Sequence, residues 1–193
     1  SPHKAKTIEK FLKGEYKVEA SKGHVRDLPV NYMGINIANN FEPHYVISPE
    51  KKQDIKRLEG LTKKADKVFL ATDPDREGEA ISWHLAEVLG LDAKDAIRIE
   101  FNEISEKAVK TALANPRKID NNLVDAQQAR RILDRLVGYS ISPAASSRLN
   151  DNLSAGRVQS VALKMVVDQN NNESEMERIG NEYDKIEKNQ TNY

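Results

Sequence analysis

The sequence of 193 residues contains no cysteine. This absence excludes disulfide bonds and thiolate metal ligands within these residues, and it fits a reducing compartment. Long apolar runs are also missing: none approaches the roughly 20 residues that span a bilayer. No signal-peptide pattern is recognisable at the start. We therefore expect a cytoplasmic protein.

Net charge is absent as well, because 30 basic residues balance 30 acidic ones. This balance hides an uneven distribution along the chain. Residues 127–167 carry six basic and two acidic side chains, a net charge of +4. Residues 168–193 carry seven acidic and three basic side chains, a net charge of −4. The sequence thus predicts a basic segment followed by an acidic tail.

The length suits one medium domain or two small ones. Up to Pro116, compact apolar stretches alternate with amphipathic ones. Strands are predicted at residues 16–20, 67–71 and 97–101, and helices at residues 4–13, 49–66, 77–90 and 105–115. Ser105 is the expected N-cap of the last of these helices, and Gly90 ends the one before it. This alternation predicts an α/β layer with a mainly parallel sheet.

After Pro116 no strand pattern follows, and the chain reads as helical. We place a domain boundary near residue 118. The predicted organisation is an α/β domain over residues 1–118, a helical segment over 119–168 and a polar tail over 169–193. The tail is rich in Asn and Glu, which indicates a frayed helix or a disordered segment.

Three carboxylates, Asp73, Asp75 and Glu77, stand at alternate positions directly after an apolar run. Ligands of α/β layers bind at the carboxyl ends of strands, where Asp73 falls. Extended backbone places alternate side chains on one face, so Asp73 and Asp75 converge, while Glu77 opens the next helix. Oxygen ligands of this kind suit Mg²⁺, which also relieves the repulsion between them. The pattern predicts a Mg²⁺ site.

A second interpretation of these acids is structural. Asp and Glu often cap helix N-termini and complement the positive end of the helix dipole. A single aspartate in this position favours capping. The D-x-D-x-E spacing at a strand end, followed by Gly78, favours the metal site.

Residues 122–143 form an amphipathic pattern when wound at 3.6 residues per turn. The apolar side contains Ala129, Ile132, Leu133, Leu136 and Val137, and the polar side contains Gln127, Arg130, Arg131, Asp134 and Arg135. Asp134 lies four residues after Arg130 and is placed to hold its guanidinium. Arginine suits bidentate phosphate contacts, so three arginines beside one acid indicate phosphate binding. A solvated charged face is the alternative.

A second basic stretch, "NLSAGRVQSVALKMVVD", covers residues 152–168. Ser154 is the expected N-cap of a helix, and Gly156 is expected in its first turn. Arg157 and Gln159 follow directly. Free backbone N–H groups beside a glycine and an arginine make an anion site, with simple capping as the alternative.

Several stretches resemble one enzyme family. "ATDPDREGEAISWHL" (residues 71–85) is similar to the acidic motif of the Toprim domain, which type IA topoisomerases share with bacterial primases and some nucleases. "DAQQARRILDRLVGYSISP" (residues 125–143) and "LSAGRVQSVAL" (residues 153–163) resemble type IA topoisomerase segments that line the groove for single-stranded DNA. "SPHKAKTIEKFL" (residues 1–12) and "ASKGHVRDLP" (residues 20–29) resemble the opening segments of that family.

The resemblance implies a fragment of a type IA DNA topoisomerase. The parent enzyme relaxes negatively supercoiled DNA through a 5′-phosphotyrosine without ATP. It implies a Toprim-type parallel sheet followed by a helical DNA-binding segment. The implied metal ligands for Mg²⁺ are Asp73, Asp75 and Glu77. The implied catalytic residues are Lys4, His24, Asp75 and Glu77. The implied DNA-binding residues are Arg130, Arg131, Asp134, Arg157 and Gln159.

The sequence also departs from the family pattern. In the family, a strand ending in a catalytic glutamate precedes the Ser-Pro pair, whereas this sequence begins at Ser1. None of its six tyrosines is followed closely by the Arg-Thr pair that marks the nucleophile. Without a nucleophile the chain cannot break a strand by transesterification, so we expect a fragment that is inactive alone.

Two alternatives stay open at this point. A Toprim nuclease or primase-like phosphotransferase accounts for the acids but not for "QQARRILDR" or "SAGRVQS". The second alternative, from a different class, is a non-catalytic module that binds single-stranded nucleic acid.

Overall fold

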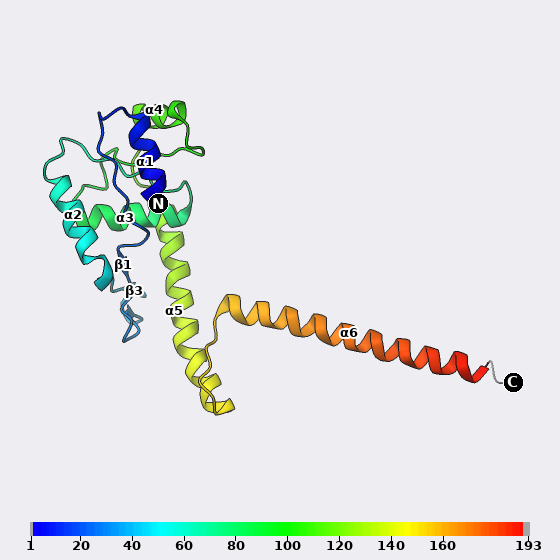
Figure 1. Cartoon of the computed structure of the whole chain (residues 1–193). Helices are drawn as coiled ribbons and strands as arrows, with labels where there is room; N and C mark the ends of the chain where they lie inside the picture. Colours follow the sequence, from blue (N-terminus) through cyan, green and yellow to red (C-terminus); the bar gives the residue numbers. More distant parts are fainter. Residues whose placement is uncertain (1, 191–193) are drawn as a thin grey trace. The chain divides into compact units, whose positions relative to one another are not determined.

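A computed structural model describes the backbone of residues 2–190 and the side chains of residues 2–178. The chain divides into two compact units, Ser1–Leu133 and Asp134–Tyr193. Figure 1 shows the elements in chain order, from blue at the N-terminus to red at the C-terminus. No helix in the described part of the chain is long and apolar enough to cross a membrane.

The helices of the first unit follow the predicted order. They are α1 (Pro2–Phe11), the short 3-10 helix η1 (Pro49–Lys51), α2 (Lys52–Thr62), α3 (Arg76–Leu89), α4 (Glu106–Ala114) and the start of α5 (Asn121–Leu149). The Ser105 hydroxyl accepts the N–H of Ala108, as an N-cap does. Gly90 follows α3 in the left-handed conformation, with φ of 67°. Both predicted helix ends are therefore confirmed.

The named strands of the first unit are short and antiparallel. β1 (Arg26–Asp27) pairs with β4 (Val46–Ile47), and β2 (Ile35–Asn36) pairs with β3 (Glu42–Pro43). The predicted strand at residues 16–20 is wrong, because residues 17–20 form neither helix nor strand. Side chains hold this segment instead: the N–H of Val18 donates to the Glu9 carboxylate (3.3 Å).

The predicted parallel pairing is present at one position, where Leu70 lies beside Arg98. Leu70 donates to the Ile97 carbonyl (2.7 Å) and accepts from the N–H of Ile99 (3.0 Å). Arg98 also pairs antiparallel with Arg117. Beyond Leu70 the ladder ends, because the carbonyl of Thr72 accepts from the Arg98 side chain (2.9 Å) rather than from a neighbouring backbone.

The hydrophobic core of the first unit lies where α2, α3, the two segments that pair at Leu70 and Arg98, and the start of α5 meet. Its buried members are Val25, Ile55, Leu70, Leu85, Ala86, Ile97, Ile119 and Val124. Burying one large aliphatic side chain contributes about 1.5–3 kcal/mol. This packing fixes the end of the segment at residue 70 and the start of α3, and with them the acidic loop between the two.

The second unit contains the remainder of α5, a loop and α6 (Arg157–Gln190). Two serines one helical turn apart on α5 hold the loop. The Ser142 hydroxyl accepts the N–H of Ala155 (2.9 Å), and the Ser146 hydroxyl accepts the N–H of Leu153 (3.0 Å). These contacts keep the loop extended, so α6 begins only at Arg157. The prediction of Ser154 as its N-cap is therefore wrong.

A mixed α/β region followed by helices confirms the predicted fold class. Part of the predicted polar tail, residues 169–190, continues α6 as helix, and residues 191–193 lie outside the described residues. The boundaries near residues 118 and 168 stay predictions.

Candidate active site

Asp73 and Asp75 lie between the segment at Leu70 and α3, and Glu77 lies in the first turn of α3. Asp75 is the N-cap of α3, and its carboxylate accepts the N–H of Gly78 (2.7 Å). The capping role that the sequence left open is thus real for Asp75. It uses one carboxylate oxygen, Oδ1.

Two N-terminal side chains reach the other two acids. The Lys4 ammonium lies 3.3 Å from Asp73 Oδ1, and both side chains are more than half exposed. His24 Nε2 donates to Glu77 Oε1, and Gln127 from α5 donates to Glu77 Oε2 (3.3 Å). The fold therefore brings Lys4 and His24, which the resemblance implies to be catalytic, next to Asp73 and Glu77.

Each acid has its own partner, and the three carboxylates do not converge on one point. Within the described residues, no group of three acidic or histidine side chains is arranged to hold a metal ion. Burial raises the pKa of Glu77, but the hydrogen bonds from His24 and Gln127 and the charge of Arg130 outweigh it and lower the pKa. Glu77 is consequently a carboxylate at neutral pH.

Gly78 lets the acidic loop lie against the first turn of α3. A Cβ at this position would stand 2.0 Å from the Asp73 carbonyl oxygen and 2.8 Å from the carbonyl carbon. No atom fits at such distances. The glycine of the motif is therefore required by close backbone packing.

Behind the loop lies an ion network that the sequence did not reveal. The Arg98 side chain is fully buried and donates to the carbonyls of Thr72 (2.9 Å) and Asp73 (2.8 Å). Its Nε donates to Glu79 (3.0 Å), which is also fully buried. Arg117 binds both oxygens of Glu79, each at 2.8 Å. The network holds the loop backbone and leaves the acid side chains outside it.

Burial raises the pKa of Glu79, but hydrogen bonds from Arg117, from the backbone N–H of Asp120 and from Arg98 outweigh it and lower the pKa to about 2. Glu79 is therefore charged at neutral pH although it is buried. Its charge is compensated by two guanidinium groups, as buried ions require.

An aromatic cluster supports the His24 side of the loop. His84 is buried against Tyr45 and Trp83, with ring centroids 4.6 and 4.8 Å away. Arg26 Nε donates to His84 Nδ1 (3.0 Å), and burial and the Arg26 charge lower the pKa of His84 to about 3. His84 is therefore a neutral ring, packed edge-on against His24 at 6.0 Å.

The predicted faces of α5 differ from the observed ones. Gln127 and Arg135, assigned to the polar side, are each only 7% exposed, whereas Leu133 on the apolar side is 45% exposed. Arg131 forms a bidentate ion pair with Asp27 (2.8 and 2.6 Å). Glu77 and Asp27, both distant in sequence, thus draw Gln127 and Arg131 of α5 inward, an effect that helical periodicity does not contain. Arg130 is exposed.

In the second unit, Arg157 and Asp134 come together. Arg157 Nε donates to Asp134 Oδ1 (2.7 Å), a partner that the sequence did not suggest for this acid. Gln159 Oε1 accepts from the Ser154 hydroxyl (3.2 Å). Arg157 and Gln159, both predicted to bind DNA, therefore lie at the start of α6, next to the loop that Ser142 and Ser146 hold.

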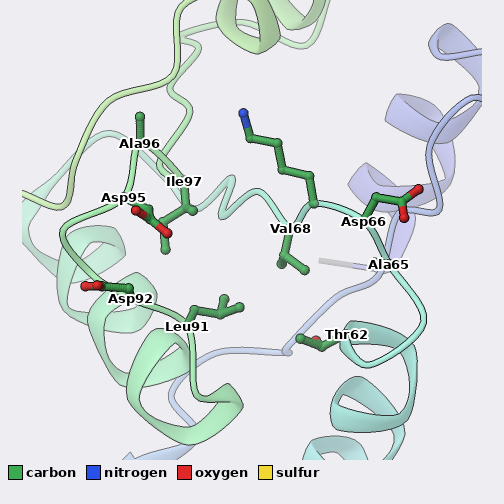
Figure 2. Close-up of a pocket in the computed structure, with 10 residues that line it drawn as sticks. Thr62, Ala65, Asp66, Val68, Leu91, Asp92, Asp95, Ala96 and Ile97 are labelled. Atoms are coloured by element: carbon green, nitrogen blue, oxygen red, sulfur yellow. The ribbon is translucent and has the colours of Figure 1, made fainter.

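A pocket of about 380 Å³ lies at the N-terminal ends of the two segments that pair at Leu70 and Arg98 (Figure 2). Asp66, Asp92 and Asp95 are among its lining residues. Asp92 Oδ1 accepts the N–H of Lys94 (2.8 Å), as in a tight turn. The acidic motif is not part of this pocket, so the hollow and the motif are separate features.

Comparisons with known proteins show the family of the chain. Residues 1–104 match the family model of the Toprim domain, and residues 118–190 match that of a DNA topoisomerase. The chain is also similar to the structure of full-length topoisomerase I from Thermotoga maritima, with 47% sequence identity and a TM-score of 0.82. The chain belongs to the type IA DNA topoisomerases.

This topoisomerase sequence covers 29% of the Thermotoga chain, while 89% of its own residues are matched. The Toprim match contains Lys4, His24 and the three acids. The DNA topoisomerase match contains the basic residues of α5 and α6. Sequence reasoning missed Glu79, Arg98 and Arg117. One signal was available: Arg98 interrupts an apolar strand between Ile97 and Ile99, both buried, and a charge there needs a buried partner.

Proposed function

We propose that this chain supplies the acidic site and part of the single-stranded DNA surface of a type IA topoisomerase. By this proposal, the whole enzyme relaxes negatively supercoiled DNA through a 5′-phosphotyrosine without ATP. The observation that carries it is the meeting of Lys4 and His24 with Asp73 and Glu77 at the start of α3. The proposal implies a cytoplasmic, nucleoid-associated protein.

The residues present fit Mg²⁺ by their donor chemistry. Asp73 and Asp75 offer carboxylate oxygens from a loop whose backbone Arg98 holds, and Glu77 offers them from the first turn of α3. The Asp73 side chain is 74% exposed and the Glu77 side chain 55%. These three residues are the proposed ligands. When bound, Mg²⁺ neutralises phosphate charge in phosphoryl transfer.

Two residues beside the acids are proposed to act on the phosphate itself. The Lys4 ammonium carries three donors on a flexible stem, and its exposed contact with Asp73 keeps it next to the acids. His24 donates its Nε2–H toward Glu77, which fixes the ring and keeps a proton donor at the loop.

The arginines are proposed to bind the DNA backbone without reading its sequence. Arg130 is exposed on α5, and Asp27 holds the guanidinium of Arg131 in one orientation. Asp134 does the same for Arg157 at the start of α6. Guanidinium groups held in this way suit bidentate phosphate contacts. With Asp134 and Gln159 they form the proposed DNA-binding set.

The experiment is a titration of a labelled single-stranded oligothymidylate at several salt concentrations. We expect weak, salt-sensitive binding, and Arg130→Gln should reduce the slope of log K against log salt by about one. Arg57→Gln on α2 is the matched control, since Arg57 pairs with Glu19 and Asp54. Equal slopes in both variants contradict the proposed role of Arg130.

Activity assays distinguish the proposed function from a Toprim nuclease or primase and from a non-catalytic binding module. We expect no plasmid relaxation, no nicking and no primer synthesis by this chain with Mg²⁺. Nicking or primer synthesis that is lost in Asp73→Ala/Asp75→Ala favours a Toprim nuclease or primase. DNA binding that is indifferent to both Mg²⁺ and this double substitution favours a non-catalytic binding module. Plasmid relaxation by the chain alone contradicts the proposed inactivity.

A further inference from the structure

Glu79 is a fourth acid in the motif, and it differs from the other three. Its side chain is completely buried, whereas Asp73 and Glu77 are mostly exposed. The proposed function gives it no role in binding Mg²⁺ or DNA. Its hydrogen bonds extend in two directions, toward the acidic loop and toward α5.

The first direction is through Arg98. Glu79 Oε2 accepts from Arg98 Nε (3.0 Å), and the other nitrogens of the same guanidinium donate to Thr72 and Asp73 (2.9 and 2.8 Å). These two carbonyls form the backbone that leads to the acids. A change in the position of Glu79 therefore displaces the group that holds the acidic loop.

The second direction is the start of α5. Glu79 Oε1 accepts the backbone N–H of Asp120 (2.7 Å), the residue directly before α5. The Asp120 carboxylate in turn accepts the N–H groups of Asn122 (2.9 Å) and Leu123 (3.4 Å), as an N-cap does. Glu79 therefore fixes the residue at which α5 begins.

A second hydrogen bond joins α3 to α5, seven residues after Asp120. Gln127 of α5 donates to Glu77, one of the proposed Mg²⁺ ligands (3.3 Å). Arg130 and Arg131 follow Gln127 within about one turn. The start of α5, with its arginines, and the acidic loop are thus connected both through Glu79 and through Glu77.

We propose that Glu79 is a positioning residue that couples the acidic loop to the start of α5, so that Mg²⁺ and single-stranded DNA strengthen each other's binding. The inference rests on the proposed function. Its physical basis is shared ordering: a metal that fixes the loop also fixes Glu79 and the first turn of α5. DNA bound along α5 then meets an already ordered loop.

The coupling is measured as the ratio of oligothymidylate dissociation constants without and with Mg²⁺, at constant ionic strength. Couplings between two sites are typically about 5–150-fold. We expect a ratio of at least about fivefold in the unaltered chain. Glu79→Gln should bring the ratio toward one, because its amide places a donor against Arg98 or Arg117.

A matched pair of substitutions tests the same link from the surface. Asp120→Pro removes the backbone N–H that Glu79 accepts, and Asp120→Ala keeps it; both remove the capping carboxylate. Asp120 is exposed, so both variants leave every buried side chain of the network in place, and only Asp120→Pro removes a hydrogen bond to it. We expect the ratio to fall in Asp120→Pro and to remain close to the unaltered value in Asp120→Ala.

The outcomes separate the inference from the proposed function. A chain that binds neither Mg²⁺ nor the oligonucleotide contradicts the proposed function. A chain that binds both with a ratio near one overturns the coupling. Equal ratios in Asp120→Pro and Asp120→Ala also overturn it, whether or not Glu79→Gln folds. Loss of the ratio with unchanged far-ultraviolet circular dichroism supports it, since a merely structural role leaves the ratio unchanged.

Discussion

Glu77 and Glu79 are two residues apart on α3 and have opposite surroundings. The Glu77 side chain is 55% exposed and contacts His24 and Gln127. Glu79 is fully buried between Arg98 and Arg117. The exposed carboxylate is one of the proposed Mg²⁺ ligands, and the buried one is held inside the fold by two guanidinium groups. The difference shows that the place of an acid on the helix decides whether it is exposed or forms part of the buried network.

The division has a physical reason. A loop that carries several like charges gains little from its own side chains, so its backbone must be held from behind. Arg98 does this through the carbonyls of Thr72 and Asp73, and Gly78 lets the backbone close on α3. The exposed acids then keep their geometry without using their carboxylates for it, except for the cap made by Asp75.

The largest expected effect comes from breaking the buried side. Glu79→Ala leaves the buried Arg98 and the partly exposed Arg117 without their shared acid, and removing one partner of a buried pair costs about 3–5 kcal/mol. Urea denaturation followed by circular dichroism measures the free energy of unfolding. The control is Glu106→Ala, which removes an exposed i,i+4 pair with Lys110 and should cost far less. Equal losses in the two variants contradict the comparison.

Acid should produce a comparable loss without substitution. The pKa of Glu79 is lowered from 4.5 to about 2 in the folded chain. Its contribution to stability is therefore complete above pH 4.5 and is lost as the pH falls toward 2. The free energy of unfolding of Glu79→Gln should fall less steeply over this range than that of the unaltered chain. Parallel pH profiles would show that Glu79 keeps an ordinary pKa.

A smaller effect tests the contact between the loop and α3. Gly78→Ala places a Cβ 2.0 Å from the Asp73 carbonyl oxygen, and overpacking of this kind costs about 1–3 kcal/mol. Gly60→Ala on α2 is the matched control, since a Cβ there meets no atom within 4 Å. In a helix interior that change stabilises by about 0.5–1 kcal/mol. Opposite signs are expected in thermal or urea denaturation.

These contrasts also show what could be predicted from sequence. The acids, the helix after them and the caps at Ser105 and Gly90 follow from local patterns, and the structure has them. The pairs Arg98–Glu79 and Arg131–Asp27 join residues 19 and 104 positions apart. Periodicity assigns a face to each residue but does not say which acid of another element will meet it. The burial of polar residues of α5 could therefore not be predicted from the sequence.

The smallest effects concern the exposed acids themselves. Asp75→Ala removes the N-cap of α3 and should cost about 1 kcal/mol. Asp73→Ala removes only an exposed contact with Lys4, worth about 0.2–1 kcal/mol. Asp75→Asn keeps a capping oxygen and should restore most of the loss. If Asp73→Ala proves more destabilising than Asp75→Ala, the exposed acids also support the fold, and the contrast with Glu79 is weaker than the structure indicates.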